Sequence, residues 1–533
     1  MGGVLVGFDI GDGLGYRLMY FAWRHRVAFA LGVITAAAAA LRFATLGDQS
    51  LDHDETVTAA RVLHADFLRS MEVVVRGERS PPLYYVLIWL WSRALGTGVV
   101  ALRSLSAVFG TLTVVFAYLA GREFASRRAG LIVALLVAVN PYLIWYSQEA
   151  RSYGALVMFG TLGLYFFARA RRGQDRRPLI GWAVASGLAL LTHYFAVFFI
   201  LPEGLLLLLG SARARRRATG AAVAAVALVG LATLPLAVVQ EGSGRGNGFS
   251  LFPVAQRAET ALVKYVTVEG AAPQAGILST TPVERELGLI AAGLVLLSIL
   301  LVSVRGSPSE RRGAAVAGGV ALVAFGVPVL MAWSGFDFVD PRNLIGAVIP
   351  ALVALGIAAS VRGAGVGALC VAGYVALFAY GLHAEATTPA MQRHDWQAAA
   401  STLPERHGAE LYVVPQDGRT PLMYYTGRKL DKFVPSHFAG GVATRRIVVV
   451  SDYAPVHNPD PRFRLASSKT APQHWTVDTY SSPRPVVITA GRLAREKIMP
   501  QPATMLAAGK PVLLAAEERA DRRAARARHD EMG

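Results

Sequence analysis

The residues best suited to chemistry form one acidic run, Asp52-His53-Asp54-Glu55, directly after the first long apolar segment. Three carboxylates within four residues are costly beside a lipid bilayer unless they face water or a functional cavity. In such a cavity a carboxylate can act as a general base toward a hydroxyl. The structural alternative is a solvated helix start, with Asp54 at or near the N-cap and Glu55 in the first turn of a helix beginning near Thr56. These residues alone leave both interpretations open.

Two further polar clusters, 140–153 and 337–343, combine acidic and basic side chains at the ends of apolar runs. In the first cluster, Glu149 and Arg151 are either anchors at the membrane interface or the carboxylate and guanidinium of a cavity. The second cluster contains Arg342. Carboxylates and fixed cations that face one cavity suit a reaction that activates a hydroxyl and expels a phosphate.

The composition indicates a membrane protein. Of 533 residues, 53% are hydrophobic and only 17% are charged, which is far more apolar than an ordinary soluble chain. The formal net charge of +17 could suggest a nucleic-acid partner, but the basic residues punctuate apolar runs, and we expect no nucleic acid. The single cysteine, Cys370, lies in an apolar segment and excludes a disulfide framework or a thiolate metal site.

About eleven apolar runs are long enough to cross a membrane as helices, at about 17–25 residues each. The run from Leu179 to Gly210 is too long for one helix and slightly short for two, and we expect a hairpin that turns near His193-Tyr194. The predicted spans lie near 27–46, 102–121, 130–148, 152–170, 179–193, 194–210, 218–240, 286–304, 313–334, 343–361 and 364–383.

Basic residues cluster at every second junction between these runs, and Lys and Arg are retained on the cytoplasmic side during insertion. One orientation satisfies all the clusters. It places 47–101, 149–151, 241–285, 335–342 and the chain after about residue 384 on the extracytoplasmic side. We therefore expect a multi-pass protein of the plasma (inner) membrane whose first span is retained rather than cleaved as a signal peptide.

The segment Leu83–Leu95 carries the aromatic residues Tyr84, Tyr85, Trp89 and Trp91 and is short for a membrane span. Aromatic side chains of this kind favour the membrane–water interface. We expect a helix that lies along the outer membrane surface and walls the acidic loop against the lipid headgroups. A twelfth span is the alternative, and it would break the orientation derived from the basic residues.

Beyond Glu385 short β-rich runs replace the long apolar ones, which is typical of a small α/β domain. The expected fold class is an all-α polytopic membrane bundle of about eleven transmembrane helices with a C-terminal extracytoplasmic α/β domain. Its strands are expected at 411–415, 446–451 and 485–489, after a helix at 396–403. The expected domains are a cytoplasmic N-terminus (1–26), a transmembrane module (27–384) containing the first outer loop (47–101), the extracytoplasmic domain (385–510) and a charged C-terminal helix or tail (511–533).

The order of these features resembles the GT-C superfamily of membrane glycosyltransferases, in particular the branch of protein O-mannosyltransferases and the lipid A aminoarabinose transferase. The resemblance covers most of residues 27–430. It departs from that branch at Ser80, where relatives often have His, and at Asn343, where they usually have Tyr. The matching residues are Asp54-Glu55, Ser80-Pro-Pro-Leu-Tyr-Tyr85, Tyr146-Ser-Gln-Glu-Ala-Arg-Ser-Tyr153, Thr192-His-Tyr-Phe195, Pro341-Arg-Asn-Leu344, Asp395-Trp-Gln-Ala-Ala-Ala400 and Tyr424-Tyr425.

The resemblance implies transfer of a mannose- or arabinose-like sugar, with inversion, from a polyprenyl-phosphate donor to an acceptor hydroxyl on the extracytoplasmic face. The acceptor is a glycan, a lipid or a protein. Asp54 would be the general base, and Glu55 would orient it or share its role. The donor phosphate would be bound by Arg151, Arg342, Lys264 and Tyr153. The other pocket residues would be His53, Tyr84, Tyr85, Gln148, Glu149 and His193.

No organic cofactor or nucleotide-binding fold is expected, because the glycine-rich stretch 242–248 has no strand and helix around it. A divalent cation could bind through residues 52–55, but adjacent residues rarely supply a complete ligand set, and no metal site is assigned. The abundant Ala and Arg are typical of high-GC bacteria.

The main alternative function is a transporter or flippase of a lipid-linked sugar or anionic lipid, and a second is a membrane scaffold. Transporters place charges near the bilayer midplane in repeat-related helices. Here the charges gather at the outer ends of spans and no internal repeat is evident, which favours an enzyme.

Overall fold

The computed structural model describes residues 25–508, apart from 174, 242–251, 268–281, 362–364, 406–409, 416, 434–440, 453–455, 473–474, 494–497 and 499–502. The segment before residue 25, the glycine-rich stretch 242–248 and the predicted tail 511–533 lie outside the described residues.

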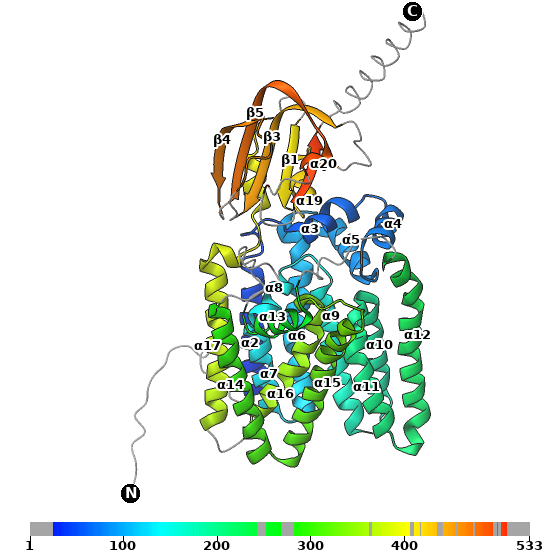
Figure 1. Cartoon of the computed structure of the whole chain (residues 1–533). Coiled ribbons are helices and arrows are strands. Elements are labelled where there is room, and N and C mark those ends of the chain that lie inside the picture. Colours follow the sequence, from blue (N-terminus) through cyan, green and yellow to red (C-terminus); the bar gives the residue numbers. More distant parts are fainter. Residues whose placement is uncertain are drawn as a thin grey trace, which may run out of the picture.

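Apolar helices form one bundle (Figure 1). Within the described residues, eight helices are long and apolar enough to cross a membrane, and the pair α7–α8, bent by 62°, counts as a ninth. With the shorter α10 and α11, the bundle accounts for all eleven predicted runs. The bundle consists of α2 (Arg26–Phe43), α6 (Val99–Phe124), α7 (Arg127–Val139), α8 (Pro141–Ser147), α9 (Tyr153–Arg172), α10 (Arg177–Thr192), η2 (Tyr194–Ala196), α11 (Val197–Gly210), η3 (Arg213–Arg215), α12 (Arg216–Glu241), α14 (Pro282–Arg305), α15 (Pro308–Trp333), η5 (Pro341–Ala347), α16 (Val348–Ala359) and α17 (Gly365–Thr387).

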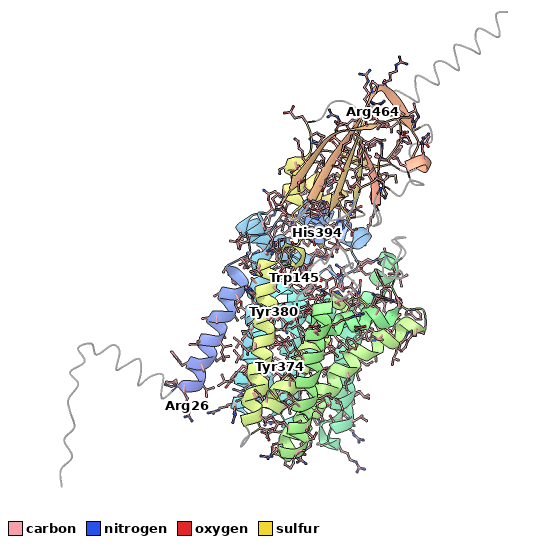
Figure 2. The ribbon with its side chains drawn as sticks, turned by 60° about the vertical axis from the view of Figure 1, so that its left-hand side comes forward. Arg26, Trp145, Tyr374, Tyr380, His394 and Arg464 are labelled. Atoms are coloured by element: carbon pink, nitrogen blue, oxygen red, sulfur yellow. The ribbon has the colours of Figure 1, made fainter. Side chains whose placement is uncertain are left out.

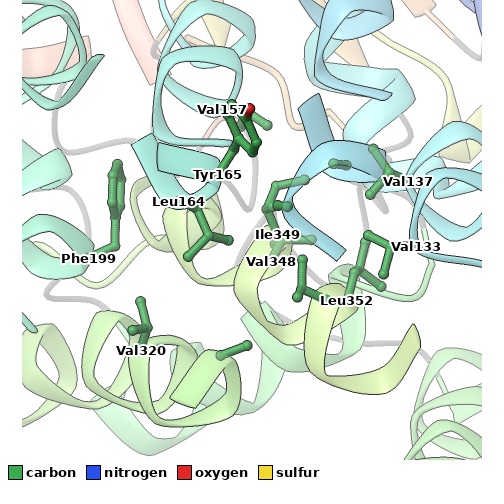
Figure 3. Close-up of a cluster of buried hydrophobic side chains, with 14 of the residues drawn as sticks. Val133, Val137, Val157, Leu164, Tyr165, Phe199, Val320, Val348, Ile349 and Leu352 are labelled. Atoms are coloured by element: carbon green, nitrogen blue, oxygen red, sulfur yellow. The ribbon is translucent and has the colours of Figure 1, made fainter. Parts of the chain in front are cut away.

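The core of the bundle is a continuous cluster of buried aliphatic and aromatic side chains. Figure 3 shows Val133 and Val137 of α7, Leu164 of α9, Phe199 of α11 and Ile349 of α16 within this cluster. Because lipid tails are as apolar as these side chains, helix association in a membrane depends on van der Waals packing and on polar contacts between helices.

A polar contact of this kind stabilises the bend between α7 and α8. Asn140 caps α8 by accepting a hydrogen bond from the Leu143 amide at 2.9 Å. Pro141 disfavours a helical conformation at the residue before it and cannot donate to the preceding turn, so α7 ends here. The buried Arg42 guanidinium donates to the carbonyl of Ala138 at 3.0 Å and so satisfies a free carbonyl at the end of α7. The chain then continues into the polar cluster predicted around residue 149.

Four short helical segments cover one end of the bundle: α3 (His53–Val57), the π-helical turn η1 (Thr58–Val62), α4 (Phe67–Gly77) and α5 (Leu83–Leu95). The bounds of α5 equal those of the predicted surface helix. On the same bundle, α13 (Val254–Lys264) packs against η5. The hairpin expected near His193 is also present, because α10 ends at Thr192 and η2 begins at Tyr194.

The C-terminal domain lies beyond these short helices (Figure 1). Its six strands are ordered β2-β6-β1-β3-β5-β4, with β1 and β3 parallel and the other neighbours antiparallel. The expected strands 411–415 and 446–451 fall within β1 and β3, and the expected strand 485–489 and helix 396–403 match the end of β5 and α18 to within one residue. The elements are η6 (Pro389–Met391), α18 (Trp396–Thr402), β1 (Glu410–Pro415), α19 (Arg419–Thr426), β2 (Leu430–Lys432), β3 (Val442–Asp452), β4 (Arg464–Ala471), β5 (Trp475–Ile488), α20 (Ala490–Leu493) and β6 (Ala503–Ala508).

The central strand β1 is buried on both faces. Leu411 and Val413 face one apolar cluster, and Tyr412 faces the other, which contains Trp396 of α18 and Leu422 of α19. Successive side chains of a strand point to opposite faces of the sheet, so this arrangement explains why β1 is a continuous apolar run. It also places α18 and α19 on one face of the sheet.

Candidate active site

The acidic run folds into the short helix α3, and Asp52 is its N-cap. The Asp52 side chain accepts from the Glu55 amide, and Glu55 Oε2 accepts from the Asp52 amide at 3.1 Å, which together form a capping box. Asp52 Oδ1 also accepts from the His53 amide at 2.7 Å. The alternative of a helix start is thus present in part: Glu55 lies in the first turn, but the helix begins at His53 rather than near Thr56, and its N-cap is Asp52 rather than Asp54. The Asp52 and Glu55 side chains do the capping, and the Asp54 carboxylate is left for another role.

Glu55 is fully buried and its carboxylate is held by Arg103 of α6. Arg103 Nε and Nη2 donate to the two carboxylate oxygens at 2.8 and 2.6 Å, and the Ala150 amide donates at 2.9 Å. Burial opposes the charge, but the Arg103 guanidinium outweighs it and holds the pKa of Glu55 below its ordinary value. These contacts fit a residue that orients the loop and leave Glu55 poorly placed to share a proton transfer.

Arg103 was not among the predicted site residues. Besides Glu55 it binds the backbone carbonyls of Leu46, Gln49 and Ser50 at 2.7–3.0 Å, so that one buried guanidinium organises the whole approach to α3. One feature of the sequence could have pointed to Arg103. It stands inside an apolar run and at the extracytoplasmic end of a predicted span, away from the other basic clusters, and an unpaired charge at such a place would be costly.

Asp54 forms an ion pair with Arg342 of η5, with Oδ2 and Nη1 separated by 2.5 Å. The two side chains are 30% and 34% exposed, whereas the Glu55–Arg103 pair is sealed from solvent. Asp340 N-caps η5 by accepting from the Arg342 amide at 3.0 Å. Burial would raise the pKa of Asp54, but the positive charges of Arg342 and Arg151 lower it well below its ordinary value. The sequence-predicted base therefore lies at an accessible place and in its charged form.

Arg151 lies on the other side of Asp54. Its Nη2 donates to Glu78 at 3.0 Å, and its Nη1 lies 3.3 Å from Thr58 Oγ1 and 3.5 Å from the Asp54 carbonyl. Glu78 also accepts from the Tyr85 hydroxyl at 2.7 Å. Within the described residues, Arg151 Nε is buried and has no hydrogen-bond partner. Glu78, which no motif singled out, holds Arg151 beside Asp54.

Aromatic side chains form the next layer of the site. Tyr153 packs edge-on against Tyr146, with ring centroids 4.9 Å apart, and lies 5.6 Å from the His193 ring. Buried His193 also accepts from the Phe195 amide at 3.3 Å through Nδ1 and caps η2, so it has a structural contact as well as its place beside Tyr153. Tyr84 is fully buried and contacts the Tyr85 ring at 5.6 Å.

Gln148 and Glu149 have different environments. Gln148 Nε2 donates to Thr45 Oγ1 at 2.8 Å and to the Arg42 carbonyl at 3.2 Å, so it secures the end of α2. Glu149 is buried, and burial raises the pKa of its carboxyl to about 8, assisted by the negative charges of Glu55 and Asp54 and opposed by Arg393 and Arg342. Gln148 therefore has a structural contact, whereas Glu149 shares the electrostatic field of Asp54.

Two predicted residues make their main contacts elsewhere. Lys264 is buried and its ammonium lies 2.6 Å from the carboxylate of Glu284, so among the described residues its counter-ion is Glu284 and not a group at Asp54. A buried ammonium requires a counter-ion of this kind. The sequence did not predict that Glu284 is the counter-ion of Lys264. His53 Nδ1 contacts the carbonyl of Asp417 in the C-terminal domain at 2.5 Å.

Among the described residues, no group of three or more His, Cys, Asp or Glu side chains could hold a metal ion. The carboxylates of Asp52 and Glu55 are instead engaged in helix capping and in the Arg103 pair.

Comparison with known proteins shows what parts of this chain are similar to. Residues 79–238 match the family described as dolichyl-phosphate-mannose-protein mannosyltransferase. Comparison with curated protein sequences gives no match. Among solved structures, ArnT from Cupriavidus metallidurans bound to undecaprenyl phosphate is 14% identical, with a TM-score of 0.51, and the alignment covers 84% of this chain and 97% of that chain. The chain has the GT-C fold.

A second structure supports the same fold. The archaeal oligosaccharyltransferase AglB from Archaeoglobus fulgidus, in complex with an inhibitory peptide and a dolichol-phosphate, is 13% identical with a TM-score of 0.50. The alignment covers 80% of this chain and 70% of that chain. The resemblance to the GT-C superfamily expected from the sequence is thus confirmed. The family match and the fold together support a glycosyltransferase.

Within this GT-C fold, the candidate site is assembled from three parts of the chain. The family match contains Arg103 and Arg151 but neither Asp54 nor Arg342. Asp54 therefore comes from the loop before the matched region, and Arg342, which faces it, comes from the 3-10 helix η5, well after that region.

Proposed function

We propose that this GT-C protein is an inverting glycosyltransferase that moves a mannose- or arabinose-like sugar from a polyprenyl-phosphate donor to an acceptor hydroxyl on the extracytoplasmic face of the plasma membrane. The observation that carries the proposal is the accessible Asp54–Arg342 pair, with Arg151 beside it. It combines a charged carboxylate with two guanidinium groups at the end of the bundle that bears α3. The acceptor is a glycan, a lipid or a protein.

Asp54 acts as the general base. Its lowered pKa keeps the carboxylate charged at neutral pH, so it can take the proton from the acceptor hydroxyl. The acceptor oxygen forms a bond to the anomeric carbon of the sugar, and the bond from that carbon to the phosphate oxygen breaks. The electron pair leaves with the polyprenyl phosphate.

The leaving phosphate requires positive charge where its own charge develops. Arg342 is partly exposed, and Arg151 has a buried Nε–H without a partner among the described residues, so both have donors to offer. When the phosphate binds Arg342, it competes with Asp54 for the same guanidinium. Weakening the ion pair raises the pKa of Asp54 and makes the carboxylate a stronger base at the stage when the donor is present.

The lipid part of the donor has an apolar place beside these cations. A pocket between α9, α11 and the η5–α16 segment is lined mainly by apolar residues, including Leu156, Phe199, Ile345 and Ile349, together with Glu203. Its η5 residues follow Arg342 by only a few positions, which places this apolar surface near the proposed phosphate ligand. The lipid phosphates named for the ArnT and AglB structures agree with this donor class.

A transfer assay tests the function directly. Purified protein in liposomes receives polyprenyl-phosphate-linked mannose or, separately, aminoarabinose, together with an envelope extract as acceptor. Release of free polyprenyl phosphate and transfer of the sugar would support the proposal. Movement of intact lipid-linked sugar across the bilayer without cleavage would instead identify a transporter. Comparing the glycans of cells with and without the protein would then name the sugar and its acceptor.

A further inference from the structure

The C-terminal domain makes polar contacts along the whole approach to Asp54. Each of the five consecutive residues from Gln49 to His53 has at least one polar contact with the segment 393–425. The pairs are Gln49 Oε1 with the Arg393 amide (3.0 Å), Ser50 Oγ with the His394 carbonyl (3.2 Å), the Leu51 amide with the Tyr425 hydroxyl (2.6 Å), Asp52 Oδ1 with Trp396 Nε1 (3.2 Å) and His53 Nδ1 with the Asp417 carbonyl (2.5 Å).

We propose that the C-terminal domain positions the acidic loop, with Tyr425 as the main positioning residue, and so sets the place of Asp54 relative to Arg151 and Arg342. This inference rests on the proposed function of Asp54. The domain thereby has a role in the transfer step itself, whatever acceptor it also contacts.

The Tyr425 contact is the best-defined of the five. Leu51 is fully buried, so its amide depends on the Tyr425 hydroxyl, and a buried donor left without a partner is costly. The Tyr425 ring also packs against the apolar cluster that contains Leu51 and Tyr85. Removing the hydroxyl alone would free the start of the acidic loop and leave this packing in place.

Trp396 extends the contact to the N-cap. Its ring is buried in the core of the C-terminal domain, 4.6 Å from the ring of Trp475, while its Nε1 donates to the capping carboxylate of Asp52. The orientation of α3 is thus coupled to a side chain fixed by another domain. Because Asp54 is the second residue of α3, a rotation of that helix would move its carboxylate relative to Arg342.

The linker before α18 reaches the opposite side of the site. Arg393 Nη2 donates to the Trp145 carbonyl at 2.9 Å, and its guanidinium lies 4.0 Å from the centre of the Trp145 ring. Figure 2 places Trp145 and His394 where the bundle meets the C-terminal domain. Trp145 belongs to α8, which leads directly to Glu149 and Arg151. The same short segment therefore contacts two of the three polypeptide stretches that supply charged groups to the site.

The test compares Tyr425→Phe with Tyr424→Phe, a matched control in the same helix, in full-length protein reconstituted in lipid. Hydrogen exchange is followed by mass spectrometry in a peptide that begins several residues before Leu51, such as 46–57, so that the Leu51 amide keeps its label. We expect the Leu51 amide to exchange roughly tenfold faster in Tyr425→Phe and at the wild-type rate in Tyr424→Phe. In the transfer assay, kcat of Tyr425→Phe should fall roughly three- to tenfold while KM for the donor stays unchanged, because the phosphate-binding residues are untouched.

Unchanged exchange and unchanged kcat in Tyr425→Phe would overturn the positioning role. The exchange measurement does not depend on activity, so it separates this inference from the proposed function. Faster exchange in a protein that transfers no sugar would support the contact and refute the glycosyltransferase. If kcat falls but Tyr425→Phe and Tyr424→Phe are destabilised equally, Tyr425 contributes only to packing, and the positioning role is refuted.

Discussion

Arg342 and Asp54 are 288 positions apart in the sequence, yet they form an ion pair in which Arg342 Nη1 lies 2.5 Å from Asp54 Oδ2. About a third of each side chain remains exposed, which distinguishes this pair from the sealed ion pairs around it. The most direct predictions concern these two residues.

Asp54→Asn should abolish sugar transfer, because the amide cannot accept the acceptor proton. We expect kcat to fall by about 100-fold or more, the usual contribution of a general base, while the melting temperature in detergent changes little. Asp48→Asn is the matched control, since Asp48 is an exposed carboxylate of the same loop. Wild-type transfer by the Asp54→Asn protein would refute the base assignment.

Arg342→Lys and Arg151→Lys test the binding of the phosphate. Lysine keeps the charge but offers no planar fork of donors, so each variant should raise KM for the donor and lower kcat, by roughly tenfold in kcat/KM for the loss of a charged hydrogen bond. Exposed Arg69→Lys in α4 serves as the control. Donor kinetics equal to wild type in both site variants would exclude these arginines as phosphate ligands.

The raised pKa of Glu149 predicts that the free energy of unfolding depends on pH. Its carboxyl has a pKa of about 8 in the folded protein against an ordinary value of 4.5. Between these pH values the folded state binds a proton that the unfolded state has lost, so the stability from this group falls as pH rises from about 4.5 to about 8. Melting curves of wild type and Glu149→Gln should therefore diverge with rising pH in favour of the variant. Parallel curves across this window would contradict a protonated Glu149.

Lys264 should contribute to stability rather than to donor binding. Its ammonium and the Glu284 carboxylate are both buried, and removing one partner of a buried ion pair typically costs about 3–5 kcal/mol. We expect Lys264→Met to lower the melting temperature and the double variant Lys264→Met with Glu284→Met to recover much of it, with donor KM unchanged in both. A raised donor KM in the double variant would restore Lys264 as a phosphate ligand.

Much of the bundle follows from hydropathy alone, because a membrane span must be an apolar helix of a certain length. The same reasoning gave the bounds of α5 and the turn at His193. It misplaced the start of α3, since Asp52 and Asp54 are both good cap residues and only the pairing of Asp52 with Glu55 decides between them.

The sequence predicted which charged residues belong to the candidate site, but it did not predict which of them form ion pairs with each other. The sequence placed the segments of Asp54, Arg151 and Arg342 on the same side of the membrane, and in the structure these three side chains lie close together. The partners Arg103 and Glu78 were missed, because a single arginine in an apolar run or a single glutamate in a loop carries no spacing signal. Such pairs form between distant segments, and only the packed structure brings them together.

Arg342 uses Nη1 to hold the Asp54 carboxylate, and a donor phosphate that binds the same guanidinium competes with this ion pair. Before the donor arrives, the Asp54 carboxylate is engaged by Arg342, and water at the site is not activated. In the proposed enzyme, binding of the lipid donor therefore prepares Asp54 for the acceptor, and an idle site is protected from futile hydrolysis.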